Sequence, residues 1–393
     1  MADKKQNQKE KRNAKGGGSV RQRANGKWEA RCTINGKTRS FYADKQADAL
    51  KLMRDAQKAV DDQTYVEPSK LTVGEWLDIW LEDYYKPTVT PNSYFITASI
   101  LKNHLKPRFG KYKLQELNAL HIQKFIGDTL NQKKISNTHL NRIIATLSST
   151  LKRAQKLAFI KINPCEACTL PKKEKKKITP LSEDEIALFL QEIQKEPCPF
   201  RYLFFVTLFT GMRMGEVLGL SWDNIDFKNK TITIKQQLYM RNAKKISGTP
   251  YLIATTKNGK ERTITPPSIV MEALKEARKE QLKNQIAVGL AWNNQFNLVF
   301  TGKLGKPINY TSVHDHYKAI VTRIGRPDAR FHDLRHTYAV MTLQEGVSPK
   351  TIQQNLGHAT VDFTLNVYAH VSETMEKECA DRLQNYYLKL AAK

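Results

Sequence analysis

The sequence predicts a multidomain α+β protein, and three observations lead to that fold class. The chain has 393 residues, more than one hydrophobic core usually organises, so two or three domains are expected. A short β-rich segment near the N-terminus is followed by segments with apolar residues three and four positions apart. Polar stretches separate these patterns, as linkers do. We expect a small sheet-and-helix domain, a helical bundle and a mostly helical third domain with a small β-sheet.

The N-terminal part of the chain predicts a basic tail followed by three short strands. Residues 1–18 are polar and basic and end in three glycines, a composition typical of disorder. In residues 19–62, Asn25-Gly26 and Asn35-Gly36 are the residue pairs preferred in two-residue hairpin turns. Apolar and polar residues alternate between these turns, so the middle strand has one apolar and one polar face.

An amphipathic helix is expected next, over residues 45–60 with Asp44 as its cap, and it would cover the apolar face of the sheet. The other face stays uncovered, and the arginines expected on it are Arg21, Arg23 and Arg31. On pattern alone, this face is as compatible with a solvated surface as with a DNA contact.

Residues 70–168 predict a small bundle, because four segments show helical apolar spacing. The first segment opens with a capping box at Thr72–Glu75, and the second opens at Thr90-Pro91. The third spans residues 117–126 and the fourth residues 137–157. Lys102 and Arg142 are candidates for phosphate contacts in this bundle. A plain surface charge is the alternative interpretation of each.

A basic linker is expected at residues 169–181, and the third domain at residues 182–370. A second capping box, from Ser182 to Glu185, opens that domain. Residues 371–393 again have helical apolar spacing. We expect them to form a tail helix, and the pattern is compatible with docking on the same chain or on a neighbouring copy.

Composition narrows the class of partner. The chain has 64 basic against 38 acidic residues, a net charge of +26, which is typical of proteins that bind polyanions. A ribosomal-type or membrane-surface protein is the alternative. No apolar run approaches the length of a membrane span, so a cytoplasmic location is expected. The cysteines are odd in number and scattered, and the zinc-like spacing of Cys165 and Cys168 lacks matching partners, so we favour reduced structural thiols.

The first candidate site residue is Arg213. The apolar run before it predicts a buried helix, and Thr210 or Gly211 can cap the following helix, which places Arg213 in the first turn. Glu216 lies on the same face, close enough to hold the guanidinium. The alternative, a surface ion pair, is disfavoured because the neighbouring helices are apolar.

A small sheet is expected downstream, with strands over residues 231–238 and 251–256. Asn258-Gly259 predicts a tight hairpin that leads to a further strand at residues 262–264. Lys257 and Lys260 flank this turn; a lysine at a hairpin tip is more often a solvated charge than a site residue.

A third candidate group occupies one helical face. His332, Arg335 and His336 stand at positions i, i+3 and i+4 of an expected helix. Two histidines four positions apart also suit zinc, but a permanently charged arginine beside them disfavours a dication. The pattern therefore favours a phosphate as the ligand.

Two further candidates follow. After Gly346, Ser348-Pro349 begins a helix that Gly357 ends, which places His358 at a helix C-terminus beside the site. Taken alone, this helix-turn-helix pattern would suggest a repressor. Tyr368 lies ten residues beyond His358 in an expected short helix. A core or surface tyrosine is the alternative there.

Two arginines, two imidazoles and a tyrosine are what phosphoryl transfer to a tyrosine hydroxyl requires. Their order and spacing resemble the catalytic boxes of the tyrosine recombinases, also called phage-type integrases. The resemblance runs from about residue 70 to the C-terminus. In addition, the N-terminal domain resembles the module with which integrases of conjugative transposons and many phages bind arm-type DNA repeats, so the resemblance favours DNA as the partner of the basic sheet face.

The resemblance implies a site-specific recombinase that integrates and excises a mobile element through a 3′-phosphotyrosyl intermediate. The resemblance implies that Tyr368 is the nucleophile, that Arg213 and Arg335 hold the phosphate, and that Glu216 supports Arg213. It also implies that His332 is the general base, Lys257 the general acid, and His358 a hydrogen-bond donor to the phosphate. No cofactor and no metal are expected, since arginines supply the positive charge.

The implied partners are double-stranded DNA, both at attachment-site cores and at arm-type repeats, and further copies of the chain, as a tetramer in the synapse. An excisionase and a host DNA-bending protein are further candidates, and no membrane is expected. The alternatives are a type IB topoisomerase-like strand cutter and a non-catalytic DNA-binding regulator. The arm-type domain and the tail argue against the first, and the complete set of site residues argues against the second.

Overall fold

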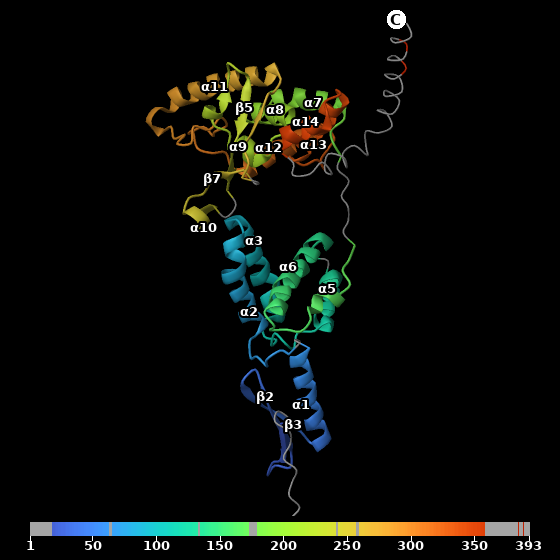
Figure 1. Cartoon of the computed structure of the whole chain (residues 1–393). Coiled ribbons are helices and arrows are strands. Elements are labelled where there is room, and N and C mark those ends of the chain that lie inside the picture. The colour runs from blue at the N-terminus through green and yellow to red at the C-terminus, as the bar shows by residue number, and fades with distance from the viewer. Residues whose placement is uncertain are drawn as a thin grey trace, which may run out of the picture. The chain divides into compact units, whose positions relative to one another are not determined.

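The computed structural model describes residues 18–62, 65–132, 134–172, 179–240, 243–256 and 259–357, together with Gln384 and Leu388 (Figure 1). The chain divides into two compact units, residues 1–174 and residues 175–393. The elements confirm the predicted fold class: a three-stranded sheet with one helix, a helical bundle, and a mostly helical part with small sheets. Within these residues, no helix combines the length and apolar character needed to cross a membrane.

The N-terminal sheet forms the predicted strands, and Asn35-Gly36 makes the predicted two-residue turn. Asn25-Gly26 instead belongs to a three-residue loop, residues 24–26, closed by the hydrogen bond from Arg23 N–H to the Lys27 carbonyl. Strands β1 (Ser19–Gln22), β2 (Trp28–Ile34) and β3 (Lys37–Ala43) are antiparallel in the order β1-β2-β3. Gly26, Asn35 and Gly36 have the positive φ that tight hairpin turns require. Helix α1 (Gln46–Asp61) packs its buried Ala49 and Met53 against the apolar face of β2.

The predicted cap of α1 is wrong. The helix starts one residue later than expected, so Lys45 is the N-cap residue and no side chain caps the first turn. Asp44 therefore lies one residue before the N-cap position, and it is a side chain at the N-cap position that reaches the free amides of the first turn.

The uncovered face of the sheet carries arginines that share one carboxylate. Arg21, Arg23 and Arg31 all donate to Glu29 over 2.8–2.9 Å, and the Tyr42 hydroxyl donates to it over 3.0 Å. The Glu29 side chain is fully buried, while the arginine side chains stay 40–55% exposed. The hydrogen bond from Arg23 contributes most to holding the pKa of Glu29 far below its usual range, against the effect of desolvation. The arginines are thus oriented by Glu29 rather than independently solvated.

The bundle is built from four helical segments around one core. They are α2 (Val73–Ile79) extended by a π-helical stretch (Trp80–Tyr85), α3 (Pro91–Ile100) continuing through a second π-helical stretch (Leu101–Leu105) into α4 (Lys106–Phe109), α5 (Ala119–Gln132) and α6 (Asn137–Lys156). The capping box at Thr72 and Glu75 and the cap at Thr90 are confirmed, whereas the third segment begins at Ala119, two residues later than predicted. Lys102 and Arg142 are exposed.

In the second unit, helices surround a large hydrophobic core, and a smaller cluster lies around Leu343 and Ile352. Its elements are α7 (Glu183–Gln194), α8 (Phe200–Thr210), α9 (Met214–Leu218), β4 (Ile225–Asp226), β5 (Thr231–Ile234), β6 (Gln236–Tyr239), α10 (Ala243–Ser247), β7 (Leu252–Thr255), β8 (Arg262–Ile264), α11 (Ser268–Val288), α12 (Tyr310–Arg323), α13 (Asp333–Gln344) and α14 (Pro349–Leu356). The buried α8 is central: α7, α11 and α13 pack against it, and α13 also contacts α14 (Figure 1). The predicted capping box at Ser182 is confirmed.

The strands of this unit differ from the prediction. The stretch predicted as one strand over residues 231–238 forms two, with Lys235 between them, and the alternation of buried and less buried residues does not continue beyond Lys235. One sheet has the order β4-β5-β8 and the other pairs β6 with β7. The strands on either side of the 258–259 turn therefore do not form the expected hairpin with each other, since each completes a different sheet.

The Glu29 cluster predicts how acid and mutation affect the first unit. Because the pKa of Glu29 is lowered in the folded state, its stabilising contribution is complete above its ordinary value of 4.5 and declines as pH falls below that value. Glu29→Ala should lower the melting temperature at neutral pH, measured by circular dichroism. Glu67→Ala, which removes an exposed partner of Arg39 in the same unit, is the matched control and should change it little. Equal shifts for the two variants would contradict the assigned role.

Candidate active site

The loop between α8 and α9 places Arg213. Gly211, with φ of 61°, ends α8 in the left-handed conformation, and the next helix begins only after Arg213, which is itself the N-cap residue of α9. The expectation that Thr210 or Gly211 caps α9, with Arg213 in its first turn, is therefore wrong. The Thr210 hydroxyl is used inside α8, where it donates to the Val206 carbonyl.

Glu216 is the buried centre of this region, with an exposed fraction of 1%. Its carboxylate accepts the Arg213 backbone N–H over 3.0 Å and Nη1 of the same residue over 2.8 Å. Arg262 donates to both carboxylate oxygens, Nη1 over 3.1 Å and Nη2 over 2.6 Å. Burial opposes ionisation, but the hydrogen bonds and charges of Arg262 and Arg213 outweigh it, and the pKa of Glu216 falls to about 2. One carboxylate thus holds two guanidiniums.

Arg335 lies in the protein interior, only 1% exposed. Its Nη1 donates to the Gly211 carbonyl over 2.7 Å and its Nη2 to the Leu356 carbonyl over 2.5 Å. Burial and then the nearby charge of Arg213 lower its pKa to about 9, which still leaves it charged at neutral pH. The side chain joins the C-terminal ends of α8 and α14.

Three arginines converge on the last carbonyls of α14. Arg262 Nε donates to Asn355 over 2.7 Å, Arg335 donates to the next carbonyl, and Arg213 Nη2 donates to Gly357 over 3.3 Å. These carbonyls have no partner within their helix, and the negative end of the helix dipole favours cations. Gly357 ends α14 with φ of 65°, as predicted. The arginines therefore fix the helix end that directly precedes His358.

The two histidines of the site lie beside Arg335. His332 is the N-cap residue of α13 rather than part of its first turn, and its ring centroid lies 5.0 Å from that of His336. Desolvation by surrounding protein atoms, then the charges of Arg335 and Arg213, lower the pKa of His332. Desolvation and the neighbouring His332 lower the pKa of His336 to about 4. Both imidazoles are therefore neutral near pH 7, with His332 exposed and His336 buried.

The structure brings together only part of the predicted site. Arg213, Glu216, His332 and Arg335 meet around the α8–α9 loop and the end of α14. Lys257, His358 and Tyr368 lie outside the described residues, as does the predicted tail helix apart from Gln384 and Leu388, which are helical.

Sequence reasoning missed Arg262. The signal was present, because Arg262 stands two residues from the buried Ile264 in one strand and therefore shares its inward face. A cation on an inward face needs a buried carboxylate.

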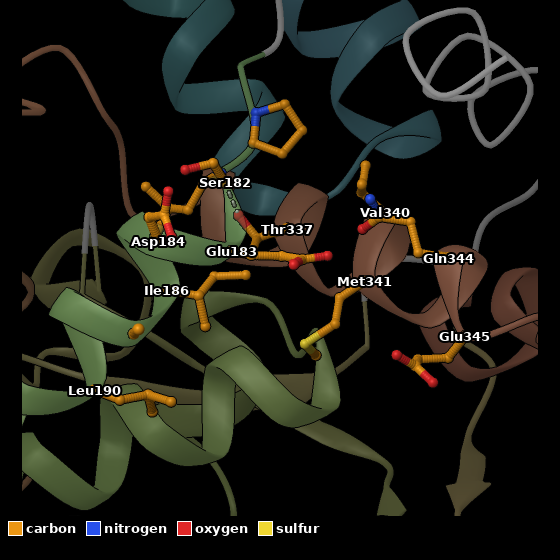
Figure 2. Close-up of a pocket in the computed structure, with 13 residues that line it drawn as sticks. Ser182, Glu183, Asp184, Ile186, Leu190, Thr337, Val340, Met341, Gln344 and Glu345 are labelled. Atoms are coloured by element: carbon orange, nitrogen blue, oxygen red, sulfur yellow. Dashed lines mark hydrogen bonds between the residues drawn. The ribbon is translucent and has the colours of Figure 1, made fainter. Parts of the chain in front are cut away.

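A groove with a volume of about 700 Å³ lies between α7 and α13 (Figure 2). Its floor is apolar, from Ile186, Leu190, Val340 and Met341, and the first residues of α7 form part of its rim. None of the predicted catalytic residues lines it. The arginine cluster is a separate feature of this unit.

The close packing of Gly211 gives a stability prediction. A Cβ at this position would lie 2.5 Å from Leu356 Cδ2 and 2.7 Å from Tyr338 Cδ1, in addition to the strain of a positive φ. Gly211→Ala should cost about 2 to 5 kcal/mol in the free energy of unfolding. Gly325→Ala also places a side chain at positive φ, but it meets no atom within 4 Å, so it should cost only about 1 to 2 kcal/mol. Urea unfolding of the full-length variants compares the two, and equal losses would refute the close contact.

Comparison with known proteins identifies the family. Residues 179–375 match the model of the phage integrase family, and residues 72–129 match that of the phage integrase N-terminal SAM-like domain. A tyrosine recombinase XerC-like protein of Caldanaerobacter subterraneus is 27% identical over 93% of this chain and 98% of its own length. The ICEBs1 integrase of Bacillus subtilis is 26% identical over 75% of this chain and 78% of its own.

Solved structures show the same fold. The Tn1549 transposon integrase in complex with a circular intermediate DNA has a TM-score of 0.67 at 19% identity, covering 80% of this chain and 99% of that one. A lambda integrase tetramer bound to a Holliday junction has a TM-score of 0.55 at 16% identity, covering 88% of this chain and 94% of that one. With half of its length matched by the family model, the chain belongs to the phage integrase family and is a tyrosine recombinase.

Proposed function

We propose that this recombinase integrates and excises a mobile element, cutting DNA with Tyr368 and rejoining it through a 3′-phosphotyrosyl intermediate. The observation that carries the proposal is the convergence of Arg213 and Arg335 at the end of α14, immediately before His358. A covalent phosphotyrosyl link conserves the energy of the broken phosphodiester for rejoining.

The charges of the cluster favour an anionic ligand. Arg213, Arg262 and Arg335 carry three positive charges against the one negative charge of Glu216, so the cluster has a net charge of +2. Arg213 is 26% exposed and can present donors to a phosphate. We assign Arg213 and Arg335 to the non-bridging oxygens, where fixed donors stabilise the charge that develops in the transition state.

Proton transfer is assigned to His332 and Lys257. The neutral, exposed His332 suits a general base that takes the proton of the attacking tyrosine. Lys257 is assigned as general acid for the departing 5′ oxygen, and His358 as a donor to the phosphate. These two roles rest on the order of residues in the sequence.

The remaining parts are assigned to DNA binding and assembly. We propose that residues 19–62 bind arm-type repeats with Arg21, Arg23 and Arg31, and that residues 70–168 bind the core site with Lys102 and Arg142 among their contacts. Residues 169–181 are the linker, residues 182–370 the catalytic domain and residues 371–393 the tail helix.

DNA and other copies of the chain are the proposed partners, within the cytoplasm. The integrase structures compared above are bound to DNA, and one is a tetramer on a Holliday junction, which supports DNA binding and oligomerisation of this chain. We further propose a tetrameric synapse, with an excisionase and a host DNA-bending protein as accessory factors.

The nucleophile is tested by Tyr368→Phe. This change removes only the attacking oxygen, so DNA affinity should persist while covalent trapping on a nicked duplex of the element's joined ends disappears. Peptide mapping of the wild-type complex should place the nucleotide on the peptide that contains Tyr368. An adduct on Tyr386 or Tyr387, or undiminished trapping by the variant, would overturn the assignment.

The general acid is tested with a leaving group that needs no proton. Lys257→Ala should cleave normal DNA slowly and recover speed on a duplex with sulfur at the 5′-bridging position. Lys260→Ala is the matched control, since it removes the other lysine of the same turn. Rescue of the Lys260 variant instead would move the role to that residue.

A further inference from the structure

Arg262 connects three segments of the catalytic unit. Its guanidinium binds both oxygens of Glu216, and its Nε binds the Asn355 carbonyl in the last turn of α14. The side chain is 12% exposed, and each of its nitrogens already donates to a protein oxygen. Arg262 therefore uses its hydrogen-bond donors within the protein and holds neighbouring segments together.

The contact with α14 is close. Gly357 has φ of 65°, and a Cβ on it would lie 3.2 Å from both Cδ and Nη1 of Arg262. The helix end and the guanidinium are thus packed against each other as well as hydrogen-bonded. His358 is the next residue in the chain.

Arg262 also lies downstream of Lys257, five residues further along the sequence. Its strand, β8, pairs with β5, with Arg262 opposite Ile234. The turn before it is closed by Gly259, whose N–H donates to the Thr256 carbonyl, and by the Thr256 hydroxyl, which donates to the Lys260 carbonyl. Arg262 thus stands two residues beyond Lys260, whose carbonyl accepts this hydrogen bond.

We propose that Arg262 is a positioning residue for DNA cleavage, which holds Glu216, and through it Arg213, against the end of α14. The inference rests on the proposed function. Without Arg262, the Glu216 carboxylate keeps Arg213 as its one guanidinium partner among the described residues, and the Asn355 carbonyl loses its donor. The Arg213 guanidinium then has to neutralise the buried Glu216 carboxylate alone, so it moves toward Glu216 and away from the proposed phosphate-binding position.

The test separates DNA binding from cleavage in the full-length chain. Single-turnover covalent trapping at saturating nicked duplex, made from the element's joined ends, gives the cleavage rate, and a filter-binding titration gives the affinity. Arg262→Ala should bind DNA nearly as wild type and cleave about 10 to 100 times more slowly, because displaced catalytic groups act on rate rather than on affinity. Arg262→Lys should recover only part of the rate, since an ammonium does not reproduce the two-oxygen contact.

A control arginine and a double variant make the test specific. Arg326 is similarly buried, at 14% exposed, and binds Glu185 and the Thr179 carbonyl away from the cluster. Arg326→Ala should match the stability loss of Arg262→Ala, measured by thermal unfolding, yet cleave near the wild-type rate. Since Arg262 acts through Glu216, adding Arg262→Ala to Glu216→Gln should slow cleavage little further.

The outcomes distinguish the positioning role of Arg262 from the cleavage chemistry of the proposed function. If wild-type protein is trapped and Arg262→Ala is trapped equally fast, or if the two rate losses multiply in the double variant, the positioning role is wrong while the recombinase chemistry stands. If wild-type protein forms no covalent complex, the proposed chemistry fails and the role of Arg262 fails with it.

Discussion

The buried carboxylate of Glu216 is the interaction on which the active-site region depends. An ionised carboxylate inside a protein is costly unless cations and hydrogen-bond donors surround it. Here the donors come from Arg213, three residues before it in the chain, and from Arg262, 46 residues after it. Those arginines also bind the end of α14. Loop, strand and helix end therefore share partners for their buried polar groups.

The same assembly sets the electrostatics of the site. Arginine charges exceed the carboxylate charge, and Arg335 remains cationic although it is buried. These cations, together with desolvation, keep the imidazoles of His332 and His336 neutral. A group of fixed positive charges that would hold a phosphate thus also keeps the neighbouring His332 unprotonated at neutral pH, the form in which a general base begins the reaction. Such preorganised charge needs little rearrangement when the reaction begins.

Among the residues that the structure describes, Glu29 and Glu216 are both buried acids that order several arginines. At Glu29 the guanidiniums lie on an open sheet face and keep much of their surface in solvent. At Glu216 they are directed inward, against helix ends. The carboxylate has the same physical role in both places, since it limits the freedom of long side chains before any ligand binds. What differs is the surface on which the arginines are displayed.

The sequence by itself determined the features that local chemistry controls. Capping boxes at Thr72 and Ser182, the hairpin turns of the first sheet and the glycine that ends α14 all lie where nearby residues predict them, because each depends on a few neighbouring backbone groups. The order and spacing of the arginines and histidines likewise predicted the family, because the family's motifs are defined by that spacing.

Tertiary structure decided what depends on distant partners. The pairing of β8 with β5 rather than β7, the use of Arg213 as an N-cap residue and the contact of Arg262 with Glu216 were not predicted. Each joins segments whose separation along the chain says nothing of their distance in space. A turn motif specifies that a chain reverses, but the choice of neighbouring strand depends on which sheet buries its apolar face, and only the assembled core settles that.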